Sequence, residues 1–473
     1  MLHYIRWIGI IFIILFCQHT GFAQLKKVVT YHDTLRTQVK ELYFTMARDT
    51  VPHGKYQRFY RSGKLEGIGK FVSGKRDSIY TEYFENGQKK LFITYVDNKK
   101  QGPFKSYYAN GKVLQEGIYA DDKQQDVFKT YYESGQPKTE VHFVNNTPDG
   151  LVKEYYTNGT PKSAITYAQG QQNGLALTYH SNGKIYTEVN YKNGLPDGMY
   201  KTYYDNGQLE SEAQNQEGKR TGSFKSYYQS GKLKSEINYK SVTIARPNEQ
   251  ARASTSIVTG RDVFQSKNTT SQIDGLAKNY YENGQVKSSI NYANGVKDGL
   301  AQYFYENGTK QQEVRFSDGG TTQKIVTYYS SGNIKEEQTI KQNARTGDWK
   351  TYYDESKKIK IKETYLNNKL EGDRLLYYEN GQVQEKSPYS KGRINGIAVQ
   401  YFDSGKVKSE TEYKSGLKNG AYKQYFADGQ PEINGIYKNG KQSGSWKYLN
   451  EAGKVTKTVM YRNGQVVSEN AGS

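Results

Sequence analysis

The stretch that decides the fold is Tyr191–Asn215, which reads YKNGLPDGMYKTYYDNGQLESEAQN. It opens with the turn-rich segment Asn193–Gly198, and the turn Asp205-Asn206-Gly207 then separates two runs of six and eight residues. Asn-Gly between such runs signals a β-hairpin, because both central residues of its tight turn must tolerate a positive φ. Gly recurs too often for a helix, and no 3.6-residue period is present. The stretch therefore predicts two antiparallel strands.

The same Tyr-Tyr-x-Asn-Gly phrase recurs along most of the chain at a spacing of 24 residues. One degenerate copy of the repeat, at Tyr352-Tyr353, has lost its Gly and gained a residue. With that copy there are sixteen repeats in two blocks of eight. They predict an all-β fold, an elongated antiparallel β-hairpin repeat array in which each repeat contacts only its neighbours. The recurring Gly stands at Gly63, Gly87, Gly111, Gly135, Gly159, Gly183, Gly207, Gly231, Gly284, Gly308, Gly332, Gly381, Gly405, Gly429 and Gly453.

The repeats set the expected domain organisation. Residues 51–240 form repeat block one and residues 274–473 form repeat block two with a C-terminal cap. Residues 24–50 are an N-terminal cap or partial repeat. Between the blocks, residues 241–273 are polar and without a clear period, which predicts a flexible insert or linker.

The first 23 residues differ from the rest. Arg6 precedes an apolar run from Trp7 to Phe16, and small residues lead up to Ala23. This pattern predicts a secretory signal peptide over residues 1–23, with an uncleaved anchor as the alternative. The apolar run is short for a transmembrane helix, which needs about 20 residues, and no later segment is apolar enough to span a bilayer. We therefore expect an exported protein that is periplasmic, on the cell surface or secreted.

Composition limits the chemistry of the mature chain. Cys17 is the single cysteine and leaves with the leader, so no disulfide, thiol nucleophile or cysteine metal site is expected. The formal charge of +19 becomes +18 without Arg6. Such basicity permits an anionic partner, but it also keeps a long sheet soluble. Tyr, present 45 times, can cover apolar surface with its ring while its hydroxyl stays hydrated.

Alternation within the strands separates two faces. Aromatic residues such as Phe104, Phe128 and Trp446 share one recurring position and define an aromatic, half-buried face. The opposite face carries Lys two residues before the first Tyr of each pair, and the following strand adds Glu residues such as Glu116 and Glu140. Cross-strand pairs of these types are stabilising without any ligand. The candidate binding face comprises Lys105, Tyr107, Lys129, Tyr131, Lys153, Tyr155, Lys201, Tyr203, Lys225 and Tyr227.

With its Tyr-Tyr-x-Asn-Gly-Gln phrase, the chain resembles the MORN-repeat-variant family over roughly residues 40–465, apart from the insert. The resemblance implies a β-hairpin array that scaffolds partners or membranes, and some variant members carry an antitoxin label. MORN-containing enzymes have a separate catalytic domain, and no segment here is left to form one.

No catalytic constellation is apparent. Among the histidines, only His32 and His53 fall in adjacent repeats, and His180 replaces the second Tyr of its pair. Acidic residues such as Asp149, Asp197, Asp274 and Asp298 precede Gly and read as turn residues. We find no phosphate-binding Gly loop. We therefore expect no enzymatic activity, no catalytic or cofactor-binding residue, no cofactor and no metal.

The expected function is an exported, non-catalytic scaffold that binds a protein, an anionic glycan or a lipid surface through the repetitive Lys, Tyr and Glu face. Nucleic acid is an unlikely target for an exported protein, although Tyr between Lys residues can stack on bases. The alternative is an antitoxin or immunity-type protein that sequesters one effector.

Overall fold

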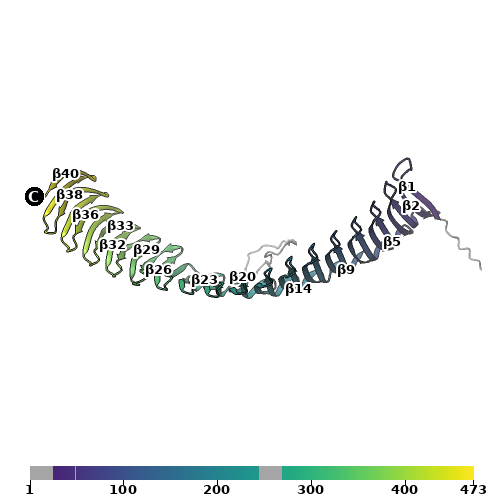
Figure 1. The fold of residues 1–473 in the computed structure, drawn as a ribbon, viewed down its shortest axis with the longest axis horizontal. Coiled ribbons are helices and arrows are strands. Elements are labelled where there is room, and N and C mark those ends of the chain that lie inside the picture. The colour runs from purple at the N-terminus through teal and green to yellow at the C-terminus, as the bar shows by residue number, and fades with distance from the viewer. Residues whose placement is uncertain (1–24, 48, 244–268, 473) are drawn as a thin grey trace, which may run out of the picture. The chain divides into compact units, whose positions relative to one another are not determined.

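The computed structural model describes residues 25–47, 49–243 and 269–472 (Figure 1). The predicted leader, residues 1–23, lies outside the described residues. Every regular element among those described is a β-strand in antiparallel pairing, which confirms the all-β hairpin array. The chain divides into two compact units, residues 1–184 and 185–473. No described residue belongs to a helix that is long and apolar enough to cross a membrane.

In the first unit, consecutive strands pair from β1 to β14, with β11 and β12 as two parts of one interrupted strand. The strands are β1 Leu25–Tyr31, β2 Val39–Met46, β3 Pro52–Phe59, β4 Leu65–Val72, β5 Lys75–Tyr83, β6 Lys89–Val96, β7 Lys99–Tyr107, β8 Val113–Ala120, β9 Lys123–Tyr131, β10 Pro137–Val144, β11 Thr147–Pro148, β12 Gly150–Tyr155, β13 Pro161–Ala168 and β14 Gln171–Tyr179.

The second unit repeats this pattern from β15 to β40. Its strands are β15 Ile185–Lys192, β16 Leu195–Tyr203, β17 Leu209–Gln216, β18 Lys219–Tyr227, β19 Leu233–Thr243, β20 Thr269–Ile273, β21 Gly275–Tyr280, β22 Val286–Ala293, β23 Val296–Phe304, β24 Lys310–Ser317, β25 Thr322–Tyr328, β26 Ile334–Lys341, β27 Ala344–Arg345, β28 Gly347–Tyr352, β29 Ile359–Leu366, β30 Lys369–Leu370, β31 Gly372–Tyr377, β32 Val383–Ser390, β33 Arg393–Ile394, β34 Gly396–Tyr401, β35 Val407–Lys414, β36 Leu417–Tyr425, β37 Pro431–Lys438, β38 Lys441–Leu449, β39 Val455–Arg462 and β40 Gln465–Ala471.

Two kinds of turn alternate along each unit. In the loop after the Tyr pair, the N–H of Tyr132 donates to the carbonyl of Gln136 and the N–H of Gly135 donates back to Tyr132, both at 2.8 Å. The other turn has two central residues with positive φ, as at Asn193 (51°) and Gly194 (79°). The Asp-Gly pairs differ from expectation, because Gly198 (φ 107°) lies inside β16 next to a register shift. These glycines form bulges within strands and not turns.

Side-chain hydrogen bonds join each Tyr loop to the next repeat. The hydroxyl of Tyr132 donates to the carbonyl of Tyr155, 23 residues later, at 2.8 Å, and equivalent bonds recur every 24 residues. The loop Asn adds a second link, since Asn206 Nδ2 donates to the carbonyl of Gln229 at 3.2 Å. The same Asn caps its own loop by accepting from the N–H of Gln208 at 2.9 Å. Each loop therefore depends on the loop that follows it.

The core lies on the predicted aromatic face. Phe128 and Trp446 are each 2% exposed, and their rings make edge-to-face contacts with neighbouring tyrosines such as Tyr119. Gly117 lies opposite Phe104 and beneath the Phe128 ring, where a Cβ atom would come within 2.6 Å of ring carbons. Large and small residues therefore alternate across the strands. Cations cover the rings from one side, as Lys100 does over Tyr119 at 4.9 Å.

At the insert, the strand ladder continues further than the repeat period alone suggests. Strand β19 runs to Thr243 and pairs with β20, so residues 241–243 and 269–273 belong to a hairpin. Residues 244–268 of the insert lie outside the described residues. The hydroxyl of Tyr228 donates to the carbonyl of Tyr280 at 2.7 Å, although 52 residues separate them. The Tyr-loop edge of the sheet is therefore uninterrupted at this point.

Candidate functional site

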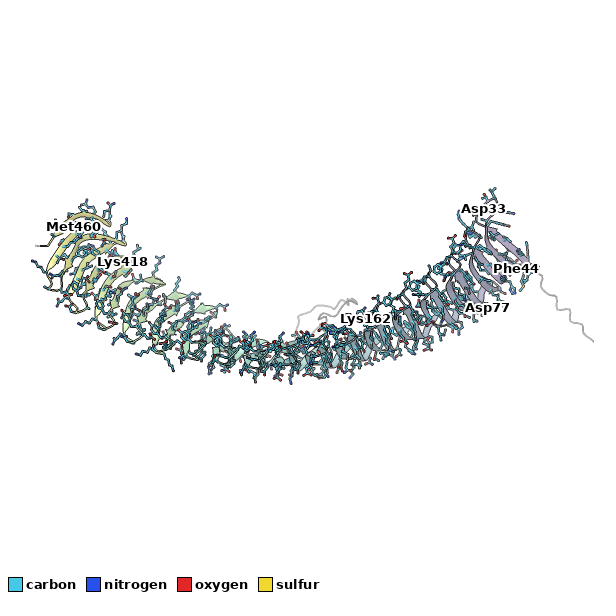
Figure 2. All side chains as sticks on the ribbon, viewed as in Figure 1. Asp33, Phe44, Asp77, Lys162, Lys418 and Met460 are labelled. Carbon is cyan, nitrogen blue, oxygen red and sulfur yellow. The ribbon has the colours of Figure 1, made fainter. Side chains whose placement is uncertain are left out.

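The candidate binding face consists of cross-strand columns, as its spacing predicts. In the first unit Lys105 lies opposite Glu116, Glu116 opposite Lys129, Lys129 opposite Glu140 and Glu140 opposite Lys153. In the second unit the same alternation includes Lys201 and Lys225. We call this side of the sheet the lysine face. Side chains project along the strands of both units in Figure 2.

The Glu residues of this face hold both the Lys and the Tyr columns. Glu116 accepts a hydrogen bond from the Tyr131 hydroxyl at 2.7 Å and pairs with the Lys105 ammonium at 2.8 Å. Tyr203 and Tyr227 make the same bond to Glu residues fifteen positions earlier, at 2.9 and 2.8 Å. Tyr107 and Tyr155 stand in the same column. The position fifteen residues before Tyr107 holds Phe92 and not Glu.

These contacts shift the pKa values of side chains on the lysine face. Hydrogen bonds from Lys105 and Tyr131 lower the pKa of Glu116, and the Glu116 contact raises the pKa of Lys105. Burial, followed by the hydrogen bond to Glu116, raises the pKa of Tyr131 to about 12. Burial and Glu partners have the same effect on Tyr203 and Tyr227. The phenols are therefore neutral donors at physiological pH.

Glu residues partly neutralise the charge of the Lys columns, as the cross-strand pattern of Lys and Glu predicts. Lys129 and Lys153 both lie near Glu140, at 3.4 and 3.7 Å, while their side chains stay 44% and 41% exposed. Ion pairs as exposed as these contribute little to stability. The ammonium groups can therefore exchange partners, but the column by itself carries alternating charge and is not a uniform cationic surface.

Beside the Lys column, the first unit has an exposed apolar strip that sequence reasoning missed. We call it the apolar belt: Ile79, Val96, Ile118, Val127, Val144 and Leu151. Five of its members are 37–51% exposed, and Val127 is half-buried. Val127 and Leu151 stand two residues before Lys129 and Lys153 in the same strands, so they share the lysine face. The belt could have been found from the residues that depart from the repeat consensus. The predicted binding face used only the residues that follow the consensus.

A second row of lysines borders the belt on its other side. Lys75 lies opposite Val72, Lys99 opposite Val96 and Lys123 opposite Ala120, next to the two-residue turns. Directly opposite residues share a face. Lys75 and Lys99 pair with Asp97 and Asp121 at 3.5 and 3.4 Å, with every one of these side chains more than half exposed. Ile79, Ile118, Val127 and Leu151 therefore lie between two rows that contain accessible ammonium groups, whereas Val96 lies in the second row, opposite Lys99.

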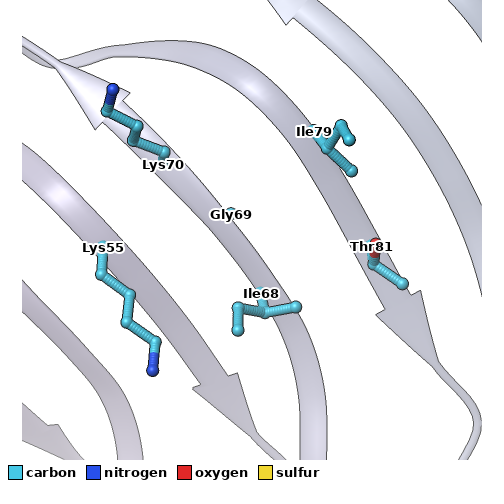
Figure 3. Close-up of a pocket in the computed structure, with 6 residues that line it drawn as sticks. All are labelled: Lys55, Ile68, Gly69, Lys70, Ile79 and Thr81. Carbon is cyan, nitrogen blue, oxygen red and sulfur yellow. The ribbon is translucent and has the colours of Figure 1, made fainter.

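Two hollows lie on this face of the first unit. One, of about 380 Å³, is lined by Lys55, Ile68, Gly69, Lys70, Ile79 and Thr81 on β3, β4 and β5 (Figure 3). The other, of about 580 Å³, is lined by Val127, Glu140, His142, Val144, Asp149, Gly150, Leu151 and Lys153. Both are lined by members of the apolar belt and by at least one Lys. Each could therefore bind an apolar group that has a carboxylate next to it.

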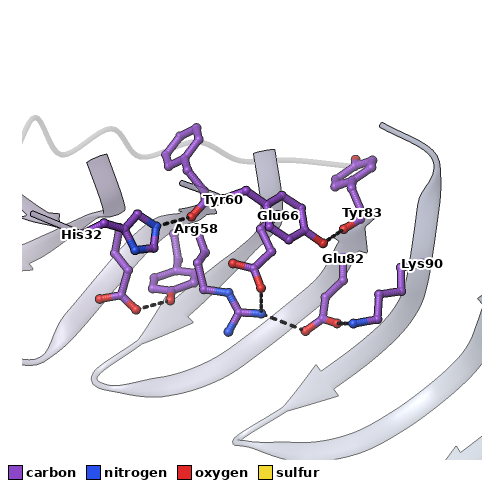
Figure 4. A network of polar contacts seen from close by, with 10 residues as sticks. His32, Arg58, Tyr60, Glu66, Glu82, Tyr83 and Lys90 are labelled. Atoms are coloured by element: carbon purple, nitrogen blue, oxygen red, sulfur yellow. Dashed lines mark hydrogen bonds and ion pairs between the residues drawn. The ribbon is translucent and has the colours of Figure 1, made fainter. Parts of the chain in front are cut away.

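The histidines have local structural partners. His142 shares a hydrogen bond of 2.5 Å with the carbonyl of Asp149, and its Nε2 lies 3.7 Å from Asp126. His32 Nε2 is 2.9 Å from the carbonyl of Phe59 (Figure 4). The backbone of His180 closes its loop as Tyr does elsewhere, by donating to Lys184 at 2.8 Å. No group of three or more His, Cys, Asp or Glu placed to hold a metal occurs within the described parts of the chain.

Other polar residues also have structural roles. Asp274 accepts from the N–H of Asn294 at 3.0 Å and pairs with Lys240 at 2.8 Å, so it caps the tight turn of the next repeat. Near the N-terminus, Arg58 lies between Glu66 and Glu82, at 3.0 and 3.4 Å (Figure 4). These contacts tie neighbouring repeats together.

Comparison with known proteins agrees with the repeat geometry. The family model described as MORN repeat variant matches twelve segments that cover more than half of the chain. No match among curated proteins is found. The matched segments are residues 52–72, 100–121, 127–145, 148–169, 172–193, 196–214, 220–241, 273–294, 297–318, 370–391, 394–415 and 418–439.

Two solved structures have a distant likeness to the chain. One is described as "Crystal Structure of TcdB2-TccC3", with 12% identity, a TM-score of 0.12, and coverage of 95% of this chain and 24% of the other. The second is the same complex without its hypervariable C-terminal region, with 11% identity, a TM-score of 0.14, and coverage of 93% and 30%. The chain thus spans less than a third of the length of either structure.

Proposed function

The chain belongs to the MORN repeat variant family, and we propose that it is an exported, non-catalytic scaffold that binds a partner through the lysine face of its first unit. The observation that carries this proposal is the apolar belt, which lies beside accessible lysines on the same face. A sheet face whose only role is structural gains nothing from exposed Ile and Leu side chains aligned in successive repeats. Aligned apolar exposure of this kind marks interaction sites.

A non-catalytic role is supported by how the polar groups are used. Tyr131 and Lys105 are partners of Glu116, and Asp274 caps a turn. The absence of a cofactor and the export of the chain are parts of the proposal that rest on the sequence. Export is checked by N-terminal sequencing of the secreted or periplasmic protein, which should begin at Gln24.

A second candidate function is sequestration of a single effector. In the second unit the strand position of Leu151 holds exposed apolar residues in some repeats, at Met199, Leu276 and Ile397, but polar residues interrupt them at Ser223, Lys324, Asp348 and Asp373. In the first unit the residues at this position from Ile79 to Leu151 are apolar without interruption. One partner bound at one place requires only such a local run.

Site-specific photocrosslinking tests the proposed function. A benzoylphenylalanine at Ile118 should give a discrete crosslinked product in the producing cells. The matched position in the second unit is Asn238, which has the same place in its repeat and is also exposed. No product at Ile118, or equal products at both positions, would overturn the proposal. One dominant protein product would favour sequestration over attachment to a polymer.

A further inference from the structure

We infer that the partner of the lysine face in the first unit is a second copy of the chain, which packs against it face to face with its repeats running in the opposite direction. This inference rests on the proposed function, because it names the partner of the same face. It follows from the alternation of charged and apolar residues from strand to strand, and from the hollow on the strands next to Ile118.

Strands of two kinds alternate across this face. The strand before a Tyr loop has Lys at both ends of the face, as Lys105 and Lys99 show in β7. The strand after a Tyr loop has Glu and a small apolar residue at the same levels, as Glu116 and Ala120 show in β8. From β7 to β12 the first row reads Lys105, Glu116, Lys129, Glu140 and Lys153, and from β6 to β10 the second row reads Val96, Lys99, Ala120, Lys123 and Val144. Neighbouring strands therefore never place two like charges side by side in either row.

This alternation makes the face complementary to itself. A two-fold axis parallel to the strands and between β8 and β9 places β8 over β9 of the other copy, β7 over β10 and β6 over β12. Glu116 then faces Lys129 and Lys105 faces Glu140, and each contact occurs twice because a two-fold interface is reciprocal. The side chains of Lys105 and Lys129 are 46% and 44% exposed, so both are accessible to a second carboxylate.

The second row is also compatible with this axis. Each Lys of β5, β7 and β9 faces an Ala or a Val of the other copy, so no two ammonium groups meet there. The strands of the two copies remain aligned, which is a common arrangement when two sheets pack face to face.

Apolar residues meet in the middle of the same face. Ile118 on β8 is 42% exposed, and the larger hollow begins on the neighbouring strand β9, where Val127, Val144 and Leu151 contribute to its lining. The proposed axis places Ile118 of each copy over Val127 of the other, at the near end of that hollow. Two exposed apolar side chains are therefore buried by one rotation.

The area of the face fits a weak dimer. The strands from β4 to β14, with β11 and β12 counted as one, span about 43 Å at about 4.8 Å per interval. On β6, Phe92 lies opposite Lys105 and Val96 opposite Lys99, so the two rows are four residues, or about 14 Å, apart. Each copy contributes about 600 Å², and the total of about 1,200 Å² is at the lower limit for a specific interface. We therefore expect a dissociation constant in the micromolar range.

Other arrangements and other occupants match less well. An axis through β9 would place Lys129 over itself and Lys105 over Lys153. An axis perpendicular to the strands would place Lys105 over Lys99. A uniformly acidic partner, such as an anionic membrane, would meet Glu116 as well as the lysines. Binding to an anionic membrane is therefore an outcome of the test.

Two opposite charge variants of the mature chain test the inference by analytical ultracentrifugation. K105E/K129E makes the first row acidic from β7 to β10, and E116K/E140K makes the same row basic. Each variant alone should dimerise at least about tenfold more weakly than the wild type, because like charges meet across the axis. An equimolar mixture restores every Lys-Glu contact and should form a heterodimer within about threefold of the wild-type affinity. Recovery in the mixture also shows that both variants fold.

Matched changes in the second unit serve as controls. K201E/K225E makes the same change in charge at the corresponding strand positions and should leave dimerisation unchanged. I118E should weaken the dimer at least about tenfold, whereas N238E, at the equivalent exposed position, should not. Dimerisation of the wild type should weaken as salt is added. Vesicles of phosphatidylglycerol and phosphatidylcholine are tested by sedimentation in parallel.

Several outcomes overturn the inference. These are a wild-type chain that stays monomeric well above micromolar concentrations, a mixture that does not recover although circular dichroism shows both variants folded, equal loss in K201E/K225E, or binding to vesicles without dimerisation. Photocrosslinking at Ile118 in cells separates the two proposals. A product with the mass of two chains supports both, and a product with a different protein leaves the proposed function standing without the dimer. If no product forms, the proposed function fails as well.

Discussion

Removing the hydroxyl groups that link successive Tyr loops should weaken the array without changing its shape. Tyr108, Tyr132 and Tyr156 donate to the carbonyls of Tyr131, Tyr155 and Tyr179 at 2.8, 2.8 and 2.9 Å. A Tyr→Phe change keeps the ring and removes only the donor. A hydrogen bond of this kind contributes about 0.5–1.5 kcal/mol net, so each change should cost about 1 kcal/mol.

The three bonds belong to successive repeats, so their effects should add to about 3 kcal/mol. Repeat arrays need not unfold in one step, so hydrogen exchange of the amides in β7–β14 is the appropriate measurement. The chain also contains its own reverse control, because Phe402 and Phe426 occupy the Tyr position without a hydroxyl. Phe402→Tyr should add a bond to the next repeat and slow exchange there. A triple variant that stays within about 0.5 kcal/mol of the wild type would show that water replaces these bonds at no cost.

Three further effects follow from the structure. Ser78 has a φ of 75° where most repeats have a bulge Gly, so Ser78→Gly should stabilise the first unit by about 0.5–1 kcal/mol in urea unfolding. Gly117→Ala puts a methyl group into the Phe128 ring and should destabilise by about 1–3 kcal/mol; an unchanged midpoint would contradict this packing. The pKa of Tyr131 is raised to about 12, so the unfolded chain loses this proton first and stability should fall between pH 10 and pH 12. The pKa of Glu116 is lowered by Lys105 and Tyr131, so stability should also fall as the pH drops below 4.5; flat profiles in both ranges would contradict the Tyr-Glu-Lys contacts.

The period of the sequence was enough to predict the hairpins, the aromatic face and the pairing of residues such as Lys105 and Glu116. These features depend on strand alternation, which every repeat shares. The bulges were misread as turns, because Asp197-Gly198 has the composition of a turn and only the strand pairing shows that it lies inside β16. The apolar belt was missed for a different reason. Averaging over repeats removes differences such as that between Val127 and Ser223, and those differences determine where the apolar residues follow one another without interruption.

The bonds between repeats could not be predicted from the consensus alone. The Tyr hydroxyl has many possible acceptors, and its choice of a carbonyl 23 residues later depends on how closely adjacent loops approach. The same reasoning applies to Lys75, which becomes part of a border only once Val72 is known to lie opposite it. Sequence period therefore determines what each repeat contains, and packing determines what each repeat contacts.

The bond from Tyr228 to Tyr280 has a consequence for how such chains can change. It joins loops on either side of the insert as though the repeats were consecutive, so the Tyr-loop edge acts as a continuous spine. The opposite edge, where β19 leads towards β20, can accept extra chain without breaking that spine. Long segments should therefore be tolerated in evolution or engineering at the two-residue turns, for example at Asn193-Gly194. The Tyr loops should accept only small changes, such as the single added residue after Tyr352-Tyr353, where the Tyr353 hydroxyl still donates to the next repeat at 2.8 Å. The Tyr-loop edge therefore keeps successive repeats connected, and the edge with the two-residue turns can accept added residues.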